Sequence, residues 1–154
     1  MLKLSKLTDY AMVVMAHLAR HPEKSSNARS IAEQTGIALP TTSKLLKRLA
    51  QYRLLVAQRG VKGGYRLILP ASGISLLEII QALEGQVALT ECSHTERRCS
   101  VEKHCLIRDN WRKISAFFHG TLDRISVSDL IRPLELEPLL KQLVVIRKHR
   151  EYSE

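Results

Sequence analysis

The chain has 154 residues, which is the length of one compact domain or of two very small ones. Hydrophobic residues make up 45% and charged residues 25% of it, a balance that excludes an intrinsically disordered chain. No apolar run approaches the roughly 18 residues that a membrane span needs. The first apolar stretch lacks the cleavage site of a signal peptide and is interrupted by Asp9, His17 and Arg20. We therefore expect a cytoplasmic protein with no membrane partner.

The net charge of +9 lies entirely in the first half of the chain. Residues 1–75 hold 12 Lys and Arg against 3 Asp and Glu, whereas residues 76–154 hold 12 of each kind. A positive excess confined to one region is typical of a domain that binds a polyanion such as DNA. A solvated basic face without a specific ligand is the alternative, and membrane lipid is less favoured because the cations are spread over several elements.

Three helices are predicted in this basic half. The first follows Ser5 and ends at His21-Pro22, since the residue before a proline is disfavoured in a helix. The second, ARSIAEQT, follows Ser26 or Asn27 as its cap and stops at Gly36. The third begins near Pro40, and leucines form its apolar stripe. Apolar residues at helical spacing support the first helix: Leu7, Ala11, Val14, Met15, Leu18 and Ala19.

The second and third helices, joined by a tight turn with glycine, form a helix-turn-helix pattern. In such a pattern the second helix enters the major groove of DNA, which is wide enough to admit it. Hydroxyls and cations on its outer face are suited to base edges and phosphates. We expect the groove-facing residues to be Thr41, Thr42, Ser43, Lys44, Lys47 and Arg48.

A β-hairpin is predicted after the third helix, with strands at 54–57 and 65–69 around the turn QRGVKGG. A hairpin that follows a helix-turn-helix is a wing, and Arg66 adds a cation to this one. Glycines in the turn allow positive φ and a close approach to a sugar-phosphate backbone. An ordinary hairpin with solubilising charges is the alternative. The predicted wing contacts to DNA are Arg59, Lys62, Gly63 and Tyr65.

A further helix is predicted after a short hinge at 70–73, and the composition changes past Gly85. Ser75 and Glu78 form a capping box that opens a helix, and Gly85 ends it. We therefore expect a mainly α protein with two parts. Residues 1–75 form a winged helix-turn-helix DNA-binding domain, and residues 76–154 hold this helix, a cysteine loop at 88–105, a long dimerisation helix and a tail.

All three cysteines of the chain, Cys92, Cys99 and Cys105, lie in this loop with the spacing C-x6-C-x5-C. An odd number of cysteines in a cytoplasmic protein argues against a disulfide framework and favours a metal site or a reactive thiol. Thiolates select zinc, copper(I) or iron–sulfur clusters, and the spacing is longer than that of zinc knuckles. Three incidental buried thiols are the alternative. Two histidines, His94 and His104, could add a ligand, although adjacent side chains such as His104 and Cys105 point different ways.

A long helix is predicted after the third cysteine, with apolar residues spaced for an a/d seam that pairs with another helix. A helix packed into its own core would show a similar pattern. A seam between two subunits suits a helix-turn-helix protein, because a two-fold dimer reads two half-sites. The seam residues are Ile107, Trp111, Ile114, Phe118 and Ile125, with Thr121 in the small gap.

These features occur in one order along residues 1–130: LTDYAMVVMAHLA, the helix-turn-helix, the wing GVKGGYRL, the helix SLLEIIQALEG, three cysteines and a further helix. In this order they resemble the Rrf2 family of bacterial winged-helix transcription regulators, which includes the iron–sulfur sensors IscR and NsrR. The resemblance implies a homodimer that binds a palindromic operator in double-stranded DNA. It also implies an iron–sulfur cluster, 2Fe–2S in preference to 4Fe–4S, held by the three cysteines. Within the family the chain is most similar to regulators of SUF cluster-assembly operons.

Two positions depart from the family pattern. The family spacing is commonly C-x5-C-x5-C, and this chain has one extra residue before Cys99. In the IscR branch a histidine three residues after the third cysteine completes the site, but Arg108 stands there and cannot serve as a ligand. In the NsrR branch an aspartate in the partner's first helix does so, and its counterpart here is Asp9. The fourth ligand is therefore expected to be Asp9 from the partner subunit, with His94, His104 or an exogenous ligand as alternatives.

A cluster between the cysteine loop and the first helix would couple its presence to the separation of the two recognition helices. Its loss under iron shortage or oxidation would then change DNA affinity. Two other hypotheses are a zinc-stabilised DNA-binding protein and a thiol redox regulator. An enzyme is not expected, because the sequence has no nucleophile–base motif, phosphate loop or paired carboxylates.

Overall fold

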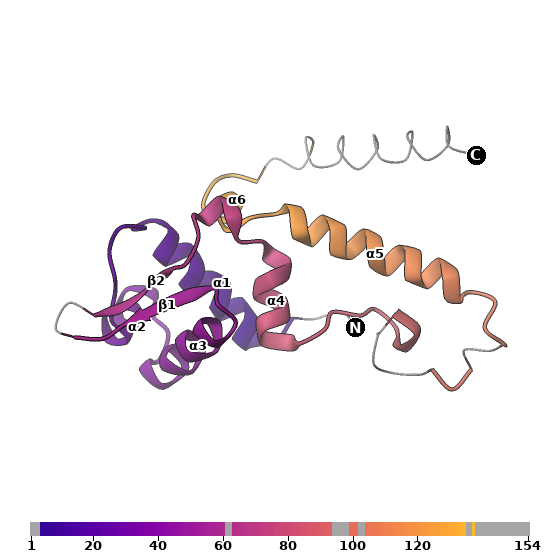
Figure 1. Cartoon of the computed structure of the whole chain (residues 1–154), viewed down its shortest axis with the longest axis horizontal. Helices are drawn as coiled ribbons and strands as arrows, with labels where there is room; N and C mark the ends of the chain where they lie inside the picture. The colour runs from indigo at the N-terminus through magenta and orange to yellow at the C-terminus, as the bar shows by residue number, and fades with distance from the viewer. Residues whose placement is uncertain (1–3, 61–62, 94–98, 102–103, 135–136, 138–154) are drawn as a thin grey trace.

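The computed structural model describes residues 4–60, 63–93, 99–101, 104–134 and 137. Figure 1 shows a bundle of short helices with a two-stranded hairpin on one side and a long helix extending from the other. The mainly α fold with a hairpin wing is thereby confirmed. None of the described helices has the length and apolar content needed to cross a membrane. In chain order the elements are α1 (Lys6–Ala19), α2 (Ala28–Thr35), α3 (Leu39–Gln51), β1 (Leu55–Gln58), β2 (Gly64–Leu67), the short turn η1 (Ala71–Gly73), α4 (Leu76–Glu84), η2 (Glu91–Ser93), α5 (Arg108–Arg124) and α6 (Val127–Leu130).

The helix ends follow from local capping. The Ser5 side chain accepts a hydrogen bond from the Thr8 N–H at the start of α1, and Asn27 accepts one from Ser30 at the start of α2. Gly36 ends α2 in the left-handed region at φ 71°, which favours glycine. The predicted capping box is confirmed at α4. The Ser75 side chain accepts a hydrogen bond from the Glu78 N–H, and the Glu78 carboxylate accepts one from the Ser75 N–H.

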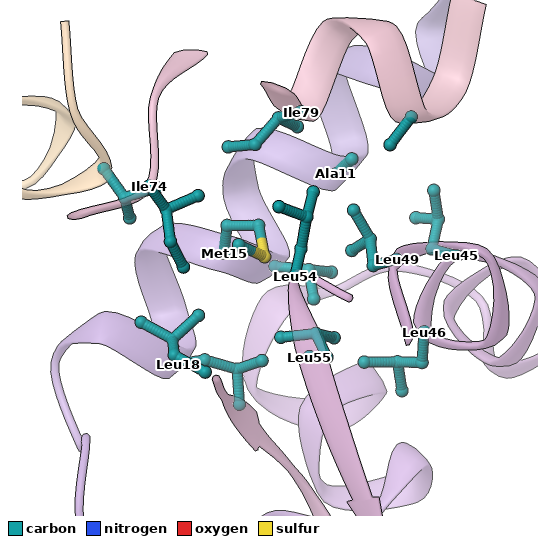
Figure 2. Close-up of a cluster of buried hydrophobic side chains, with 14 of the residues drawn as sticks. Ala11, Met15, Leu18, Leu45, Leu46, Leu49, Leu54, Leu55, Ile74 and Ile79 are labelled. Atoms are coloured by element: carbon teal, nitrogen blue, oxygen red, sulfur yellow. The ribbon is translucent and has the colours of Figure 1, made fainter. Parts of the chain in front are cut away.

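One aliphatic core joins α1, α3, the hairpin and α4. In Figure 2 side chains from α1, from α3 and from the start of the hairpin converge on one another. The apolar faces of α1 and α4 lie against each other, and α4 also contacts α3. The core therefore continues across residue 75, into the helix that the sequence analysis grouped with the second part of the chain. Its fully buried members include Ala11, Val14, Met15, Ile31, Leu45, Leu46, Leu49, Ile79, Ala82 and Val127.

The wing pairs β1 with β2 in antiparallel register, Leu55 opposite Leu67 and Gln58 opposite Gly64. A third segment joins its edge, because Ser26 and Tyr65 exchange two backbone hydrogen bonds at 2.8 and 3.1 Å. A Cβ at Gly64 would lie 2.6 Å from the Ser26 backbone. This position therefore requires glycine, and the wing is fastened to the loop before α2.

The long helix α5 extends away from the winged helix, and its last residues return to it (Figure 1). The Leu76 N–H donates to the Ile125 carbonyl at 2.7 Å, and the Val127 N–H donates to the Ile74 carbonyl at 2.9 Å. Ile125 is 9% exposed and Val127 is fully buried in the core. The predicted seam is therefore wrong at Ile125, which packs inside its own chain. Below, residues 4–85 are called the winged-helix body and residues 86–124 the cysteine arm.

Candidate functional site

The recognition helix α3 divides into a buried face and an open face. Leucines of its apolar stripe are fully buried, whereas Pro40, Lys44 and Lys47 are exposed on the opposite side. Thr41 and Ser43 are half-buried at the margins of the open face. Of the predicted groove-facing residues, the structure thus brings Thr41, Ser43, Lys44 and Lys47 to one accessible surface.

Thr42 does not belong to this surface. Its side chain is fully buried, and its hydroxyl donates to the carbonyls of Ile37 at 3.2 Å and Ala38 at 3.3 Å. The physical reason is helical geometry, because Thr42 lies one turn before the buried Leu45 and Leu46 and shares their face. The expectation that Thr42 faces the groove is corrected accordingly.

Arg48 is half-buried, and its side chain contacts α4 within the chain. Its Nε group donates to the Ala82 carbonyl of α4 at 2.8 Å. The expectation that Arg48 faces the DNA groove is corrected accordingly. The structure instead turns this guanidinium toward the end of a neighbouring helix.

The wing residues have different environments. Arg59 and Arg66 are exposed, and Lys62 lies outside the described residues. Tyr65 is half-buried against the core, so its ring is partly used by packing. Gly63 donates its N–H to the Gly60 carbonyl at 2.8 Å, and a Cβ there would collide with the Gln58 carbonyl oxygen.

Gly63 is therefore required by the wing's own backbone. Among the wing glycines that the structure describes, Gly60 alone has a positive φ, of 111°.

A carboxylate that the sequence analysis did not single out joins α4 to α1. Glu84 accepts hydrogen bonds from the Ser5 N–H at 2.9 Å and from the Thr8 hydroxyl. The Ser5 side chain first, then the Thr8 hydroxyl and the Ser5 N–H, lower the pKa of Glu84 below its ordinary value, and the charge of Arg48 acts in the same direction. The contact spans 79 positions, so no local pattern in the sequence signals it.

The three cysteines are free and half-buried. The Cys92 sulfur is hydrogen-bonded to the Thr90 hydroxyl at 3.2 Å, and the Arg112 Nε group donates to the Cys92 carbonyl at 3.2 Å. This end of the cysteine segment is thereby attached to α5. A hollow of about 330 Å³ lies between the cysteine segment and α5, and its lining includes Cys92, Ser93, Arg112, Ser115 and His119.

The other candidate ligands are dispersed in the single chain. Asp9 is exposed in the first turn of α1, His104 is exposed beside Cys105, and His94 lies outside the described residues. Within the described ranges, which omit 94–98 and 102–103, no three His, Cys, Asp or Glu side chains are gathered closely enough to hold a metal ion. The donor chemistry nevertheless suits soft metal ligation, because three unpaired thiols occur in one short segment.

The fold and the charged helix-turn-helix surface agree with a comparison against known families. The pattern of the Rrf2 family, described as iron-dependent transcriptional regulators, matches residues 4–133. The chain belongs to the Rrf2 family. It is consequently a DNA-binding transcriptional regulator and not an enzyme, which confirms those two expectations.

Individual relatives place this Rrf2 protein near two kinds of regulator. It is 32% identical to the HTH-type transcriptional regulator IscR of Vibrio atlanticus over 136 residues, 88% of this chain and 78% of that protein. The solved structure of T. potens IscR superposes with a TM-score of 0.62 at 30% identity, covering 84% of this chain and 86% of the other. CymR, the global cysteine regulator of B. subtilis, superposes with a TM-score of 0.66 at 27% identity, covering 85% and 97%.

Proposed function

We propose that this Rrf2 protein is a homodimeric regulator that binds a palindromic operator and whose DNA affinity depends on an iron–sulfur cluster held by Cys92, Cys99 and Cys105. The observation that carries the proposal is the pairing of a basic winged helix with three free thiols in one segment of the same chain. Because its partner is chromosomal DNA, we expect it to act in the cytoplasm. The genes that it controls are expected to be those for iron–sulfur cluster assembly.

The proposed DNA surface combines the open face of α3 with the wing. Thr41, Ser43, Lys44 and Lys47 serve base edges and phosphates, and the exposed Arg59 of the wing extends the positive surface, together with Lys62. Arg48, Gly63 and Tyr65 retain structural roles beside any DNA contact, since each is used within the chain.

The dimer is supported by apolar side chains that α5 leaves in solvent. Phe118 is 42% exposed, Phe117 54% and Ile107 56%, and they lie on or beside the predicted seam. Large apolar side chains left in solvent along one helix favour an interaction surface, and a second copy of α5 would cover them. Two copies would then present two recognition helices to two half-sites.

The cysteine segment would hold the cluster by its thiolates, leaving one iron position for a ligand of another kind. When bound, an iron–sulfur cluster supplies a redox-sensitive and loss-prone centre, the more so with a non-cysteine ligand. Asp9 is exposed at the start of α1 and open to a second subunit, which suits ligation in trans. His104 and an exogenous ligand are alternatives for this position, and Arg108 has no part in ligation.

The cluster is tested with protein purified without oxygen. Visible absorbance, iron and acid-labile sulfide are expected in the wild type and should be lost when any one of the three cysteines becomes alanine. Asp9→Ala should give a cluster with a shifted spectrum and a shorter lifetime, since only one oxygen ligand is removed. Ser100→Ala, exposed beside Cys99, is the matched control and should retain the cluster. Zinc as the sole bound metal, or iron and sulfide in a triple-cysteine variant, would overturn the assignment.

The wing is tested by the Arg59→Ala, Lys62→Ala double variant. If both cations neutralise phosphates, affinity should fall for all duplexes, and the slope of log affinity against log salt should flatten by about 2. Duplexes recovered by selection from a random-sequence library serve as probes. An unchanged affinity and salt slope would exclude the wing as a DNA element.

A thiol switch is the second candidate function, favoured by the free thiols and by the likeness to CymR. Two thiols and one hydrogen peroxide molecule would give one disulfide and two water molecules. Peroxide should then alter DNA binding by cluster-free protein, and removal of one participating cysteine should abolish the response. A cluster-free protein that does not respond to peroxide would eliminate this candidate.

A further inference from the structure

The last turn of α4 is fastened to the recognition helix. Arg48 of α3 donates its Nε–H to the Ala82 carbonyl at 2.8 Å. This carbonyl lies in the last turn of α4, where backbone carbonyls run out of N–H donors within the helix. A guanidinium at this position also faces the negative end of the helix dipole. The contact therefore combines a charge-assisted hydrogen bond with a favourable position along α4.

The same turn is fastened to the beginning of α1. Glu84, two residues beyond Ala82, accepts hydrogen bonds from the Ser5 N–H and from the buried Thr8 hydroxyl. The charge of Arg48 contributes to the lowered pKa of Glu84, so the guanidinium and the carboxylate act on each other across the turn. Three helices, α1, α3 and α4, are thus joined through two consecutive anchoring points.

The Glu84 anchoring point is next in sequence to two segments of the proposed metal site. Asp9 directly follows Thr8, and the segment that leads to Cys92 begins at Gly85, directly after Glu84. In the other direction, Arg48 lies on the helix that carries Lys44 and Lys47. A displacement of the α1 start or of the cysteine segment can therefore act on the last turn of α4.

We propose that Arg48 is a positioning residue that couples the last turn of α4 to the recognition helix, so that changes at the cysteine segment and at the α1 start alter DNA affinity. This proposal depends on the proposed function in one respect only, which is that the iron–sulfur cluster is the natural signal. A phosphate contact by Arg48 is the competing role, and it predicts a different dependence on salt.

The coupling is tested in cluster-free protein by a double-variant cycle of Arg48→Gln and Glu84→Gln, with affinity for a selected duplex as the readout. Glu84→Gln weakens the anchor at α1, and it should change the affinity about fivefold where Arg48 is intact. In the Arg48→Gln background the same change should have no effect. Glu78→Gln is the matched control on the same helix, because glutamine also completes a capping box.

Equal effects of Glu84→Gln in both backgrounds, or no effect in either, would overturn the coupling. A salt slope reduced by about 1 in Arg48→Gln would assign Arg48 to a phosphate and overturn it as well. Arg48→Lys is the second variant should Arg48→Gln unfold. It keeps the charge but lacks the Nε donor, so the effect of Glu84→Gln should shrink, and an undiminished effect would contradict the proposal.

A second measurement separates this proposal from the proposed function. In cluster-loaded protein, Arg48→Gln should leave the visible spectrum unchanged and bring the affinity ratio of loaded to cluster-free protein toward one. A wild type that binds no cluster would refute the proposed function, whereas the cycle in cluster-free protein would still decide the coupling.

Discussion

The winged-helix body and the cysteine arm differ in how far each buries its apolar side chains within the chain. The body buries aliphatic residues from α1, α3 and α4 in one core and caps its helix ends with Ser5, Asn27 and Ser75. In the arm, Ser115 is the only buried residue of α5, and large apolar side chains remain in solvent. The body is therefore stabilised by contacts within the chain, while the arm presents the apolar surface and the thiols that the proposed second subunit and cluster would engage.

The charge is also uneven along the chain. The excess of +9 lies in the first 75 residues, whereas the remainder is balanced. A body that supplies its own packing is free to use its surface charge for DNA. In the proposed dimer, two copies of the arm would repel each other less than two copies of the basic region, because residues 86–124 hold 7 Lys and Arg against 5 Asp and Glu.

The largest effect on the body is expected from Leu49→Ala. Leu49 is fully buried in the core, and removal of its side chain leaves a cavity, so the free energy of unfolding should fall by about 2–5 kcal/mol. Chemical denaturation measures it. The corresponding change in the arm, Ile114→Ala, removes a side chain that is 42% exposed and should cost far less in a monomeric preparation. Equal costs would show that the arm has a core of its own.

The arm should instead respond to a charge in its seam. Phe118→Asp places a carboxylate among the exposed apolar residues of α5, and we expect monomers that lose most specific DNA affinity, because only one half-site remains engaged. Sedimentation gives the oligomeric state, and titration with the selected duplex gives the affinity. A variant that stays dimeric and binds as before would show that this face serves another purpose.

Two glycines sharpen the contrast in packing. A Cβ at Gly64 would lie 2.6 Å from the Ser26 backbone, so Gly64→Ala must separate the wing from its third segment and should destabilise by about 1–3 kcal/mol. At Gly120, within α5, nothing lies within 4 Å of a new Cβ. Gly120→Ala should stabilise the protein by up to about 1 kcal/mol through helix propensity. Thermal unfolding of the two variants gives both signs, and a stabilised Gly64→Ala would contradict the described wing.

The smallest effect concerns pH. The lowered pKa of Glu84 means that its carboxylate adds stability above the pKa of the unfolded chain, about 4.3, and that this addition is lost as pH falls through the lower folded value. Glu84→Gln should therefore reduce stability at pH 7 by at most about 1 kcal/mol and flatten its decline below pH 4. Denaturation at several pH values tests this. A variant profile parallel to that of the wild type would show that Glu84 is not held as described.

Much of the DNA-binding half could be predicted because its signals are local. The cap at Ser5, the stop at Gly36 and the capping box at Ser75 each depend on residues within four positions, and the structure has all three. The face of α3 could be predicted only in part. Thr42 shares the face of Leu45 and Leu46, so its burial follows from helix periodicity, whereas only the position of α4 directs Arg48 to Ala82.

The sequence by itself determined the order of the elements, the basic winged helix, and the concentration of thiols before a long amphipathic helix. Periodicity, capping and composition act over a few residues, so they can be read from the chain. Tertiary structure alone decided that Ser26 extends the wing, that Glu84 anchors α1 across 79 positions, and that Arg48 reaches α4 across 34. Those contacts depend on how whole helices pack, because a side chain finds a distant partner only after the core between them has formed.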